Sequence, residues 1–288
     1  AAYVLSNTYQ VTLFEAENRL GGHARTVFAG NNGNQAVDTG FIVFNYPNYP
    51  ELSQLFSELN VPIAKSDMSF GASLNDGTIE YALRNFDAIF AQRKNILNPR
   101  FVKMVWDINR FNTIGLTVAD DESLTIGQFL QKLKTGDWFR DYYLLPLSGA
   151  IWSTPTEKIL DFPAYAMLQF FKNHALLSRS GQHQWYTVKG GSREYVNRLE
   201  NVLAQKRVEI RVKTPVASVT RHQTGVVVKT YSCESQTFDE VVFATHSDDT
   251  LSLLSDPSKF EQQNLGSIKY QNNDVVLHSD VTVMPKLH

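Results

Sequence analysis

Residues 10–26 read Gln-Val-Thr-Leu-Phe-Glu-Ala-Glu-Asn-Arg-Leu-Gly-Gly-His-Ala-Arg-Thr, and this stretch decides how the rest of the chain is interpreted. A short run with strand propensity, 11–14, ends in Glu15, and the pair Gly21-Gly22 follows six positions later. In a dinucleotide-binding βαβ unit the second strand ends in an acidic residue that binds the ribose hydroxyls, about 20 residues after a glycine-rich phosphate turn. That spacing places the turn before the first residue, so 1–6 is predicted to be the end of the helix that follows it.

Four further motifs follow in order along the chain. They are Asp38-Thr39-Gly40-Phe41-Ile42-Val43-Phe44-Asn45, Gly149-Ala150-Ile151-Trp152-Ser153-Thr154-Pro155, Asp161-Phe162-Pro163-Ala164 and Gly190-Gly191-Ser192-Arg193-Glu194-Tyr195-Val196. Together with Glu-Ala-x-x-Arg-x-Gly-Gly at 15–22, they resemble the signatures of the FAD-dependent amine oxidase and phytoene desaturase superfamily. Within it, the chain is most similar to a bacterial NAD/FAD-binding branch, over essentially its whole length.

The resemblance implies an α/β fold in which a Rossmann-like FAD-binding domain carries an inserted, largely helical α+β substrate domain. The FAD-binding domain is expected to be discontinuous, over residues 1–66 and 185–250, and the substrate domain to cover 67–184 and 251–288. A strand-like run at 275–281 lies close to the last residue. We therefore expect a fragment that lacks both the N-terminal glycine-rich motif and a C-terminal FAD segment.

The resemblance places the adenosine and diphosphate of FAD at the start of the chain. Glu15 is expected to accept hydrogen bonds from the ribose, and the alternative is a solvated carboxylate at a strand end. Gly21 and Gly22 would let the backbone approach the diphosphate, where a Cβ would clash. Val216 matches the position whose backbone contacts the adenine, and it also fits an ordinary strand valine.

Basic residues beside the glycine pair are expected to bind phosphate oxygens. Arg19, His23 and Arg25 offer suitable donors, and an arginine can bind phosphate through two hydrogen bonds. The family usually has arginine where this chain has His23, so the resemblance leaves open whether His23 or Arg25 faces the cofactor. Gly40 and Phe41 belong to the segment expected beside the flavin ring, where Gly40 would give the ring room.

Local patterns predict the secondary structure. Strands are expected at 9–15, 208–212, 216–221, 226–231 and 238–244, and a hairpin at 67–83 with its turn at 75–77. A helix is expected to begin at Pro50, and residues 85–180 follow a helical pattern, with helices that begin at Thr125 and near 163. Ser192 is predicted to cap a further helix.

Aromatic residues are the candidates for the substrate side. We predict an apolar pocket that includes Trp152, Phe170 and Trp185, although an aromatic stripe at helical spacing is more often core. His174 lies near these residues, where a single histidine is usually structural. No spacing of His, Cys or acidic residues predicts a metal site, and no Gly-x-Ser-x-Gly nucleophile elbow is present. The chemistry is therefore expected to come from a cofactor.

Composition excludes several classes of function. The 288 residues carry a net charge of −2, so the chain lacks the overall excess of positive charge that favours binding to nucleic acid. A single cysteine, Cys233, excludes an intramolecular disulfide. No apolar run reaches the length of a membrane span. We expect a cytoplasmic protein, with peripheral membrane association left open, and we predict no oligomeric state.

The resulting hypothesis is a flavin-dependent oxidoreductase that transfers a hydride from an apolar small molecule to FAD. Members of the resembled branch are often associated with fatty-acyl modifying enzymes, so a lipid acyl chain is the leading substrate class and association with a lipid enzyme or membrane the leading partnership. Two alternatives remain at this point. The first is an oxidase or desaturase of amines or carotenoid-like polyenes, and the second is a flavin-binding partner protein without turnover.

Overall fold

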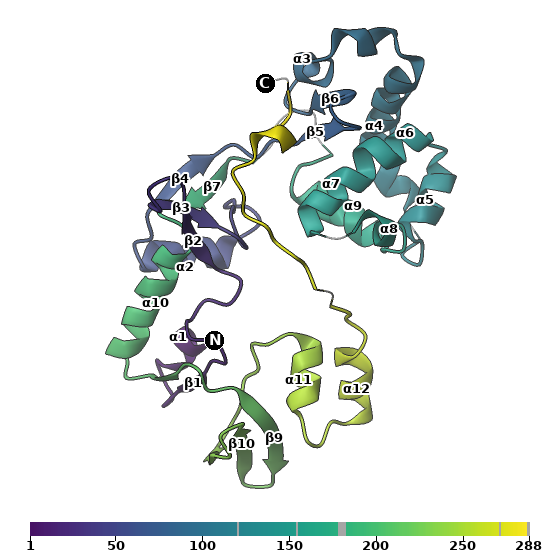
Figure 1. Ribbon diagram of the computed structural model, residues 1–288. Helices are drawn as coiled ribbons and strands as arrows, with labels where there is room; N and C mark the ends of the chain where they lie inside the picture. Colours follow the sequence, from purple (N-terminus) through teal and green to yellow (C-terminus); the bar gives the residue numbers. More distant parts are fainter. Residues whose placement is uncertain (120, 154, 178–182, 271, 287–288) are drawn as a thin grey trace. The chain divides into compact units, whose positions relative to one another are not determined.

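The computed structural model describes residues 1–119, 121–153, 155–177, 183–270 and 272–286, and it divides into two compact units (Figure 1). Unit 1 comprises Ala1–Ile42, Gln54–Ala64 and Val188–Val275, and unit 2 comprises Val43–Ser53, Lys65–Thr187 and Val276–His288. Thr154 of the second motif, and Leu287 and His288 of the predicted substrate domain, lie outside the described residues. The predicted assignment of one domain to FAD and the other to substrate stays a prediction.

The strands form small sheets. The pairs are β1 (Thr12–Phe14) with β8 (Glu209–Arg211), β2 (Thr26–Ala29) with β3 (Gln35–Asp38), β4 (Ile63–Ser66) with β7 (Trp185–Val188), and β5 (Gly71–Leu74) with β6 (Ile79–Ala82). A meander contains β9 (Val216–His222), β10 (Gly225–Thr230) and β11 (Ser235–Phe238) in the spatial order β11-β10-β9. The β1–β8 pair is parallel, with Leu13 opposite Ile210.

Helices make up most of unit 2. They are α3 (Phe86–Ile89), the 3₁₀ helix η1 (Arg93–Leu97), α4 (Pro99–Val118), α5 (Ile126–Leu133), α6 (Asp137–Phe139), the π-helix η2 (Arg140–Leu144), α7 (Leu145–Trp152), α8 (Thr156–Ile159), α9 (Ala164–Asn173) and the 3₁₀ helix η3 (Val281–Val283). The others are α1 (Ala2–Leu5), α2 (Pro50–Glu58), α10 (Arg193–Gln205), α11 (Ser247–Leu253) and α12 (Lys259–Leu265). No described helix combines the length and the apolarity needed to cross a membrane.

An aromatic core holds unit 2 together around α4. Phe111 on α4 is fully buried, and its ring lies 5.5–6.1 Å from the rings of Phe129, Phe139 and Phe171. Each large apolar side chain buried in this way contributes about 1.5–3 kcal/mol to folding. The core therefore joins α4, α5, α6 and α9 into one body.

Sequence signals at helix ends and tight turns are confirmed. Pro50 opens α2, and Thr125 precedes α5 in a capping box with Gln128. The turn at 75–77 joins β5 to β6, and all three of its residues have positive φ. The helix expected at the start of the chain and the strand runs that became β1, β8, β9 and β10 are also confirmed.

Two strand predictions are wrong. Residues 239–244 form no strand, because the pairing with β10 is made earlier, by β11. Residues 275–280 are also irregular, and η3 follows them. An apolar run becomes a strand only where a neighbour pairs with its backbone, and the described residues supply no such neighbour to either run. In the opposite direction, β2 and β3 form where no strand was predicted.

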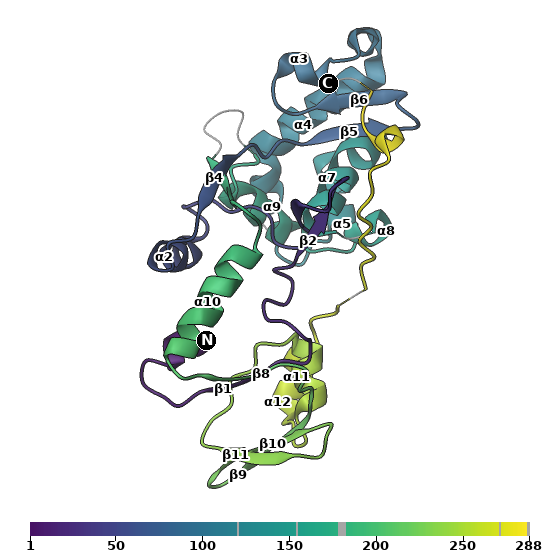
Figure 2. The same ribbon diagram turned by 60° about the vertical axis from the view of Figure 1, so that its left-hand side comes forward.

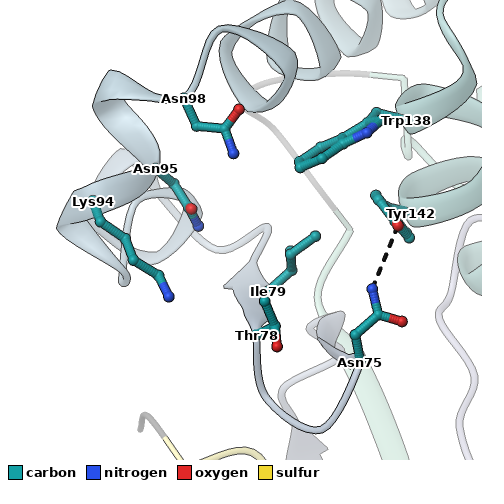
Figure 3. Close-up of a pocket in the computed structure, with 8 residues that line it drawn as sticks. All are labelled: Asn75, Thr78, Ile79, Lys94, Asn95, Asn98, Trp138 and Tyr142. Atoms are coloured by element: carbon teal, nitrogen blue, oxygen red, sulfur yellow. Dashed lines mark hydrogen bonds between the residues drawn. The ribbon is translucent and has the colours of Figure 1, made fainter.

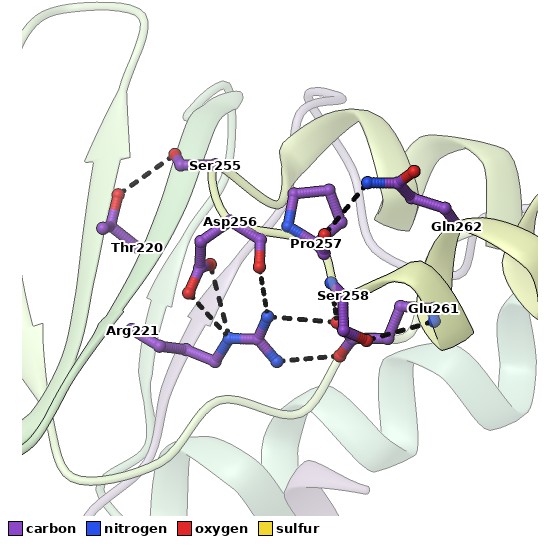
Figure 4. A network of polar contacts seen from close by, with 8 residues as sticks. All are labelled: Thr220, Arg221, Ser255, Asp256, Pro257, Ser258, Glu261 and Gln262. Carbon is purple, nitrogen blue, oxygen red and sulfur yellow. Dashed lines mark hydrogen bonds and ion pairs between the residues drawn. The ribbon is translucent and has the colours of Figure 1, made fainter.

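Arg221 fastens the α11–α12 segment to the meander of unit 1 (Figure 4). From β9, its guanidinium donates to Glu261 on α12 at 2.7 Å and to the carboxylate of Asp256 at 3.2 Å. Ser258 caps α12 and donates its backbone N–H to Glu261 at 2.8 Å. These hydrogen bonds lower the pKa of Glu261 to about 2, and the bond from Arg221 makes the largest contribution.

We expect Arg221→Gln to release α12 from the meander. Hydrogen exchange measured by mass spectrometry at neutral pH should then be faster in α12 and unchanged in unit 2. Because the pKa of Glu261 is lower in the folded chain, its contribution to stability is complete above about pH 4.3 and is lost as the pH falls toward 2. Lys259→Gln is the control, because Lys259 lies on the same helix and forms no ion pair with any residue that the structure describes. Equal exchange in both variants would contradict this role of Arg221.

Candidate functional site

The Gly21-Gly22 turn requires glycine for conformational reasons. Both residues have positive φ, +106° and +53°. A Cβ on Gly21 would lie 2.9 Å from the carbonyl oxygen of Ala24 and 3.0 Å from the side chain of Val196, whereas a Cβ on Gly22 would meet nothing within 4 Å. Gly21 therefore packs against the protein, and Gly22 leaves its backbone open on an exposed side.

The same turn carries hydrogen-bond donors without partners. Within the part of the chain that the structure describes, the backbone N–H groups of Gly22 and His23 make no hydrogen bond, and neither does the guanidinium of Arg25. Arg19 differs, because it donates to the carbonyl oxygen of Gly22 at 2.8 Å. Consecutive free N–H groups in a turn with positive φ form an anion-binding concavity. Arg19 shapes this concavity, and Arg25 is available to an anion.

Gly40 lies directly against this loop. A Cβ on Gly40 would be 1.9 Å from the carbonyl oxygen of His23, so no other residue fits without moving the backbone. The adjacent Thr39 donates its N–H to the carbonyl oxygen of Arg25 at 2.9 Å. The protein itself thus explains glycine at this position, and the predicted proximity of Gly40 and Phe41 to the flavin ring stays a prediction.

Asp38 joins the β2–β3 hairpin to the start of α10. Its carboxylate accepts the backbone N–H of Ser192 at 2.9 and 3.0 Å and the hydroxyl of Thr26 at 2.5 Å. The same hydroxyl accepts the N–H of Arg193 at 3.0 Å. A negative charge at a helix N-terminus is favourable, because it interacts with the helix dipole.

The predicted capping role of Ser192 is therefore wrong in its chemistry. Ser192 occupies the N-cap position, but its hydroxyl donates to the carbonyl oxygen of Phe41 at 2.9 Å instead of capping the helix. Asp38 caps α10 in its place, from 154 residues away in sequence. No local pattern could have revealed a cap supplied at that separation.

Glu15 and Val216 lie in one region of unit 1, beyond the ends of the parallel strands. The backbone carbonyl of Glu15 accepts the N–H of Thr214, two residues before Val216, at 2.9 Å. Oε1 of Glu15 accepts the N–H of Glu17 at 2.8 Å, and Oε2 has no hydrogen bond among the described residues. A partly exposed carboxylate held by one oxygen leaves the other free for a ligand.

His246 is a neighbour of the turn that sequence reasoning missed. Its ring stacks on that of His23 at 5.5 Å and on that of Tyr270 at 4.2 Å, so segments more than 200 residues apart meet here. The side chains of His246, Asp248 and Asp249 could jointly hold a cation, although exposed acidic groups are common without one. The only sequence signal was the position of His246 just after a predicted strand.

The three predicted substrate-side residues belong to one aromatic cluster in unit 2. The ring of Trp152 lies 5.2 Å from that of Phe170, and His174 stacks on Phe170 at 4.0 Å and on Trp185 at 5.9 Å. Nδ1 of His174 lies 2.9 Å from the carbonyl oxygen of Phe170, as expected for a donor. Nε2 is then an acceptor, and it is buried without a partner among the described residues.

A pocket of about 370 Å³ lies elsewhere on unit 2 (Figure 3). It is lined by Asn75, Thr78, Ile79, Lys94, Asn95, Asn98, Trp138 and Tyr142. Asn75 donates to the hydroxyl of Tyr142 at 3.4 Å across this pocket. None of the predicted substrate residues lines it, so it is distinct from the aromatic cluster.

Comparison with known proteins decides the family. The family model of flavin-containing amine oxidoreductases matches residues 1–279. The chain belongs to this family. The resemblance read from the sequence is thereby confirmed, together with FAD as the cofactor of the family and oxidoreduction as its class of reaction. A comparison with curated protein sequences gave no match.

Solved structures share the fold of this chain. Putrescine oxidase bound to putrescine is similar with a TM-score of 0.66 at 15% identity, over 92% of this chain and 60% of the other. A fatty acid isomerase from P. acnes that produces CLA is similar with a TM-score of 0.60 at 13% identity, over 92% of this chain and 59% of the other. The chain thus spans about 60% of the length of these relatives, and at such identities the likeness shows the fold alone.

We expect Gly40→Ala to unfold or displace the loop at 21–25, because the new Cβ would overlap the carbonyl oxygen of His23. The loss in the free energy of unfolding should exceed about 3 kcal/mol, in the range of severe core changes. Gly33→Ala is the control, since Gly33 has positive φ but open space, and it should cost about 1–2 kcal/mol. Urea unfolding of both variants measures the difference, and similar losses would show that the contact with His23 relaxes freely.

Proposed function

We propose that this chain binds FAD with unit 1 and belongs to an oxidoreductase that takes a hydride from an apolar substrate held by unit 2. The observation that carries the proposal is the turn at 21–25, whose unpaired N–H groups and free Arg25 guanidinium suit a diphosphate. Family membership supplies the identity of the diphosphate ligand as FAD. The Rossmann-like, discontinuous character of the FAD-binding domain and the insertion of the substrate domain are part of this proposal.

The residues present fit FAD at several points. Glu15 offers the free Oε2 to ribose hydroxyls, and Gly22, His23 and Arg25 offer donors to the diphosphate. Val216 supplies strand backbone near Glu15 for the adenine. When bound, the flavin ring supplies the hydride acceptor. The chain's own part is to bind and orient the cofactor and to shield the substrate from water.

An apolar substrate suits the aromatic cluster of unit 2. Trp152, Phe170 and Trp185 offer ring faces and edges, and such surfaces favour hydrocarbon over a charged group that would lose its water. A lipid acyl chain is therefore our leading substrate class, and Trp152 and its neighbours are proposed to contact it. A solved relative named as a fatty acid isomerase is compatible with this choice.

One observation favours an amine as the second candidate. The buried Nε2 of His174 is an acceptor without a partner in the described chain, and a substrate amine could donate to it. Putrescine oxidase shares the fold. A carotenoid-like polyene is the further alternative, and like an acyl chain it offers no donor to Nε2. A flavin-binding partner without turnover remains the non-enzymatic alternative.

Two substitutions test the adenosine end and the diphosphate end of the proposed FAD site independently. Glu15→Ala should weaken binding of FAD and of AMP alike, by about 1–3 kcal/mol, because both ligands carry the adenosine ribose. Arg25→Gln should weaken binding of FAD and ADP but not of adenosine. Isothermal titration of the purified chain measures all four ligands. Glu17→Ala and Lys189→Gln remove exposed charges nearby and should change none of the affinities.

The assignment of Glu15 fails if Glu15→Ala binds AMP as tightly as the unaltered chain does. The assignment of Arg25 fails if Arg25→Gln loses affinity for adenosine as well. In the second case the substitution would have disturbed the whole turn, and His23 would become the leading phosphate donor.

Substrate class is tested by anaerobic reduction of the bound flavin. We expect fatty-acyl substrates to bleach its visible absorbance and putrescine to leave it unchanged. Trp152→Ala should raise KM for the acyl substrate about tenfold, since it removes a large apolar contact. Tyr231→Ala, which truncates an exposed ring in unit 1, is the control. Bleaching by putrescine alone would establish the amine alternative, and no bleaching by any substrate would support a protein without turnover.

A further inference from the structure

Positive charge is concentrated in one short part of unit 2. Residues 84–110 contain six basic and two acidic residues, a net charge of +4 in a chain whose total is −2. This stretch comprises α3, η1 and the first half of α4. Figures 1 and 2 both show α3 at the end of unit 2 away from α8. We call this stretch the α3–α4 surface.

Four of the six cations on this surface have no ion pair within the described residues. They are Arg84, Lys94, Arg100 and Arg110. Both acidic residues are already engaged, Asp87 by Arg93 at 3.1 Å and Asp107 by Lys103 at 2.7 Å. The excess positive charge is therefore not neutralised within the surface itself.

Large apolar side chains are exposed in the same stretch. Phe86 is 73% exposed, Ile96 52%, Leu97 87% and Trp106 70%. Exposed tryptophan, phenylalanine and leucine so close together in sequence are unusual on a soluble surface without a binding role. Leu97 and Ile96 lie at the end of η1, immediately before α4 begins.

The helix geometry of α4 separates an outward stripe from the core. Lys103, Trp106 and Arg110 are spaced three and four residues apart, so they share one face, and all three are exposed. The opposite face carries Phe101 and Phe111, which are fully buried. Trp106 therefore stands between two cations on a face that the fold of unit 2 does not use.

We propose that the α3–α4 surface docks onto an anionic lipid bilayer. Trp106, Leu97, Ile96 and Phe86 insert at the boundary between headgroups and acyl chains, where aromatic rings with a polar edge are favoured. Lys94, Arg100 and Arg110 contact lipid phosphates, and each basic residue near such a surface strengthens binding about fivefold.

The distribution of charge on the α3–α4 surface favours an anionic bilayer over other binding partners. An anionic bilayer offers continuous negative charge above an apolar layer, which matches a stretch that combines exposed apolar side chains with four cations that have no ion pair among the described residues. Acidic residues at the far end of α4, Asp121 and Glu122, would be repelled by the same bilayer. The helix is thus oriented with its N-terminal half toward the lipid. This inference does not depend on the proposed flavin function, and its test needs no flavin.

The test is cosedimentation of the 288-residue chain with vesicles of phosphatidylcholine alone and with vesicles that also contain anionic phosphatidylglycerol. We expect binding to the anionic vesicles, and much weaker binding to the neutral ones. Arg100→Gln with Arg110→Gln should lower the partition coefficient about thirtyfold, from two lost charges. Leu97→Ser with Trp106→Ser should lower it at least tenfold, because both side chains lose buried apolar area.

Matched controls come from the same unit. Lys132→Gln with Lys172→Gln removes two exposed cations outside the surface and should change binding less than twofold, a factor within measurement error for distant charges. Quenching by brominated lipids gives a direct readout of insertion, because Trp106→Phe should remove most of the quenched tryptophan fluorescence. Circular dichroism of each variant verifies that the chain remains folded.

Four outcomes would overturn the proposal. They are absence of binding to anionic vesicles, equal binding to neutral vesicles, equal losses in the lysine control, and unchanged binding after loss of Leu97 and Trp106. The chain could instead self-associate and bind no vesicles. If Leu97→Ser with Trp106→Ser abolished that self-association, the surface would be assigned to contact with a second copy. Tight binding to an oligonucleotide with no vesicle binding would assign it to nucleic acid.

Discussion

The site in unit 1 depends on one backbone contact, that between Gly40 and the carbonyl oxygen of His23. The close approach leaves no room for a side chain at residue 40, and the neighbouring Thr39 donates its N–H to the carbonyl oxygen of Arg25 at 2.9 Å, which ties the loop to the segment after β3. The carbonyl oxygens of Gly21 and Gly22 are likewise bound, by Ala24 and Arg19. With its acceptors engaged, the loop presents mainly N–H groups to solvent. The proposed binding of a diphosphate rests on this arrangement, in which the carbonyl oxygens are bonded and the N–H groups of Gly22 and His23 are not bonded among the described residues.

Much of the fold could be predicted because its signals are local. Pro50 and Thr125 mark helix starts through bonds within one turn, and the turn at 75–77 needs residues that tolerate positive φ. The runs at 239–244 and 275–280 show the limit of such signals. Their composition suits strands, but a strand forms only with a partner, and pairing is a non-local property that residue pattern does not specify.

In the candidate site, too, the local features could be predicted from sequence and the contacts between distant segments could not. The motif that contains Glu15 and Gly21 locates the proposed phosphate loop from sequence alone, since it depends on neighbouring residues. The cap of α10 by Asp38 and the stacking of His246 on His23 join segments that are far apart in the chain. Spacing along the sequence carries no information about such meetings. A net charge of −2 similarly hides the local excess of positive charge on the α3–α4 surface.

The α3–α4 surface and the aromatic cluster are two sides of one core. On α4, Trp106 faces outward and Phe111 faces inward, where its ring lies 5.9 Å from that of Phe171. Phe171 in turn stacks on Trp152 at 5.9 Å. Close-packed rings within unit 2 therefore connect the outer face of α4 with the proposed substrate residues. If both proposals hold, an acyl substrate dissolved in the bilayer would meet the same unit that docks on it.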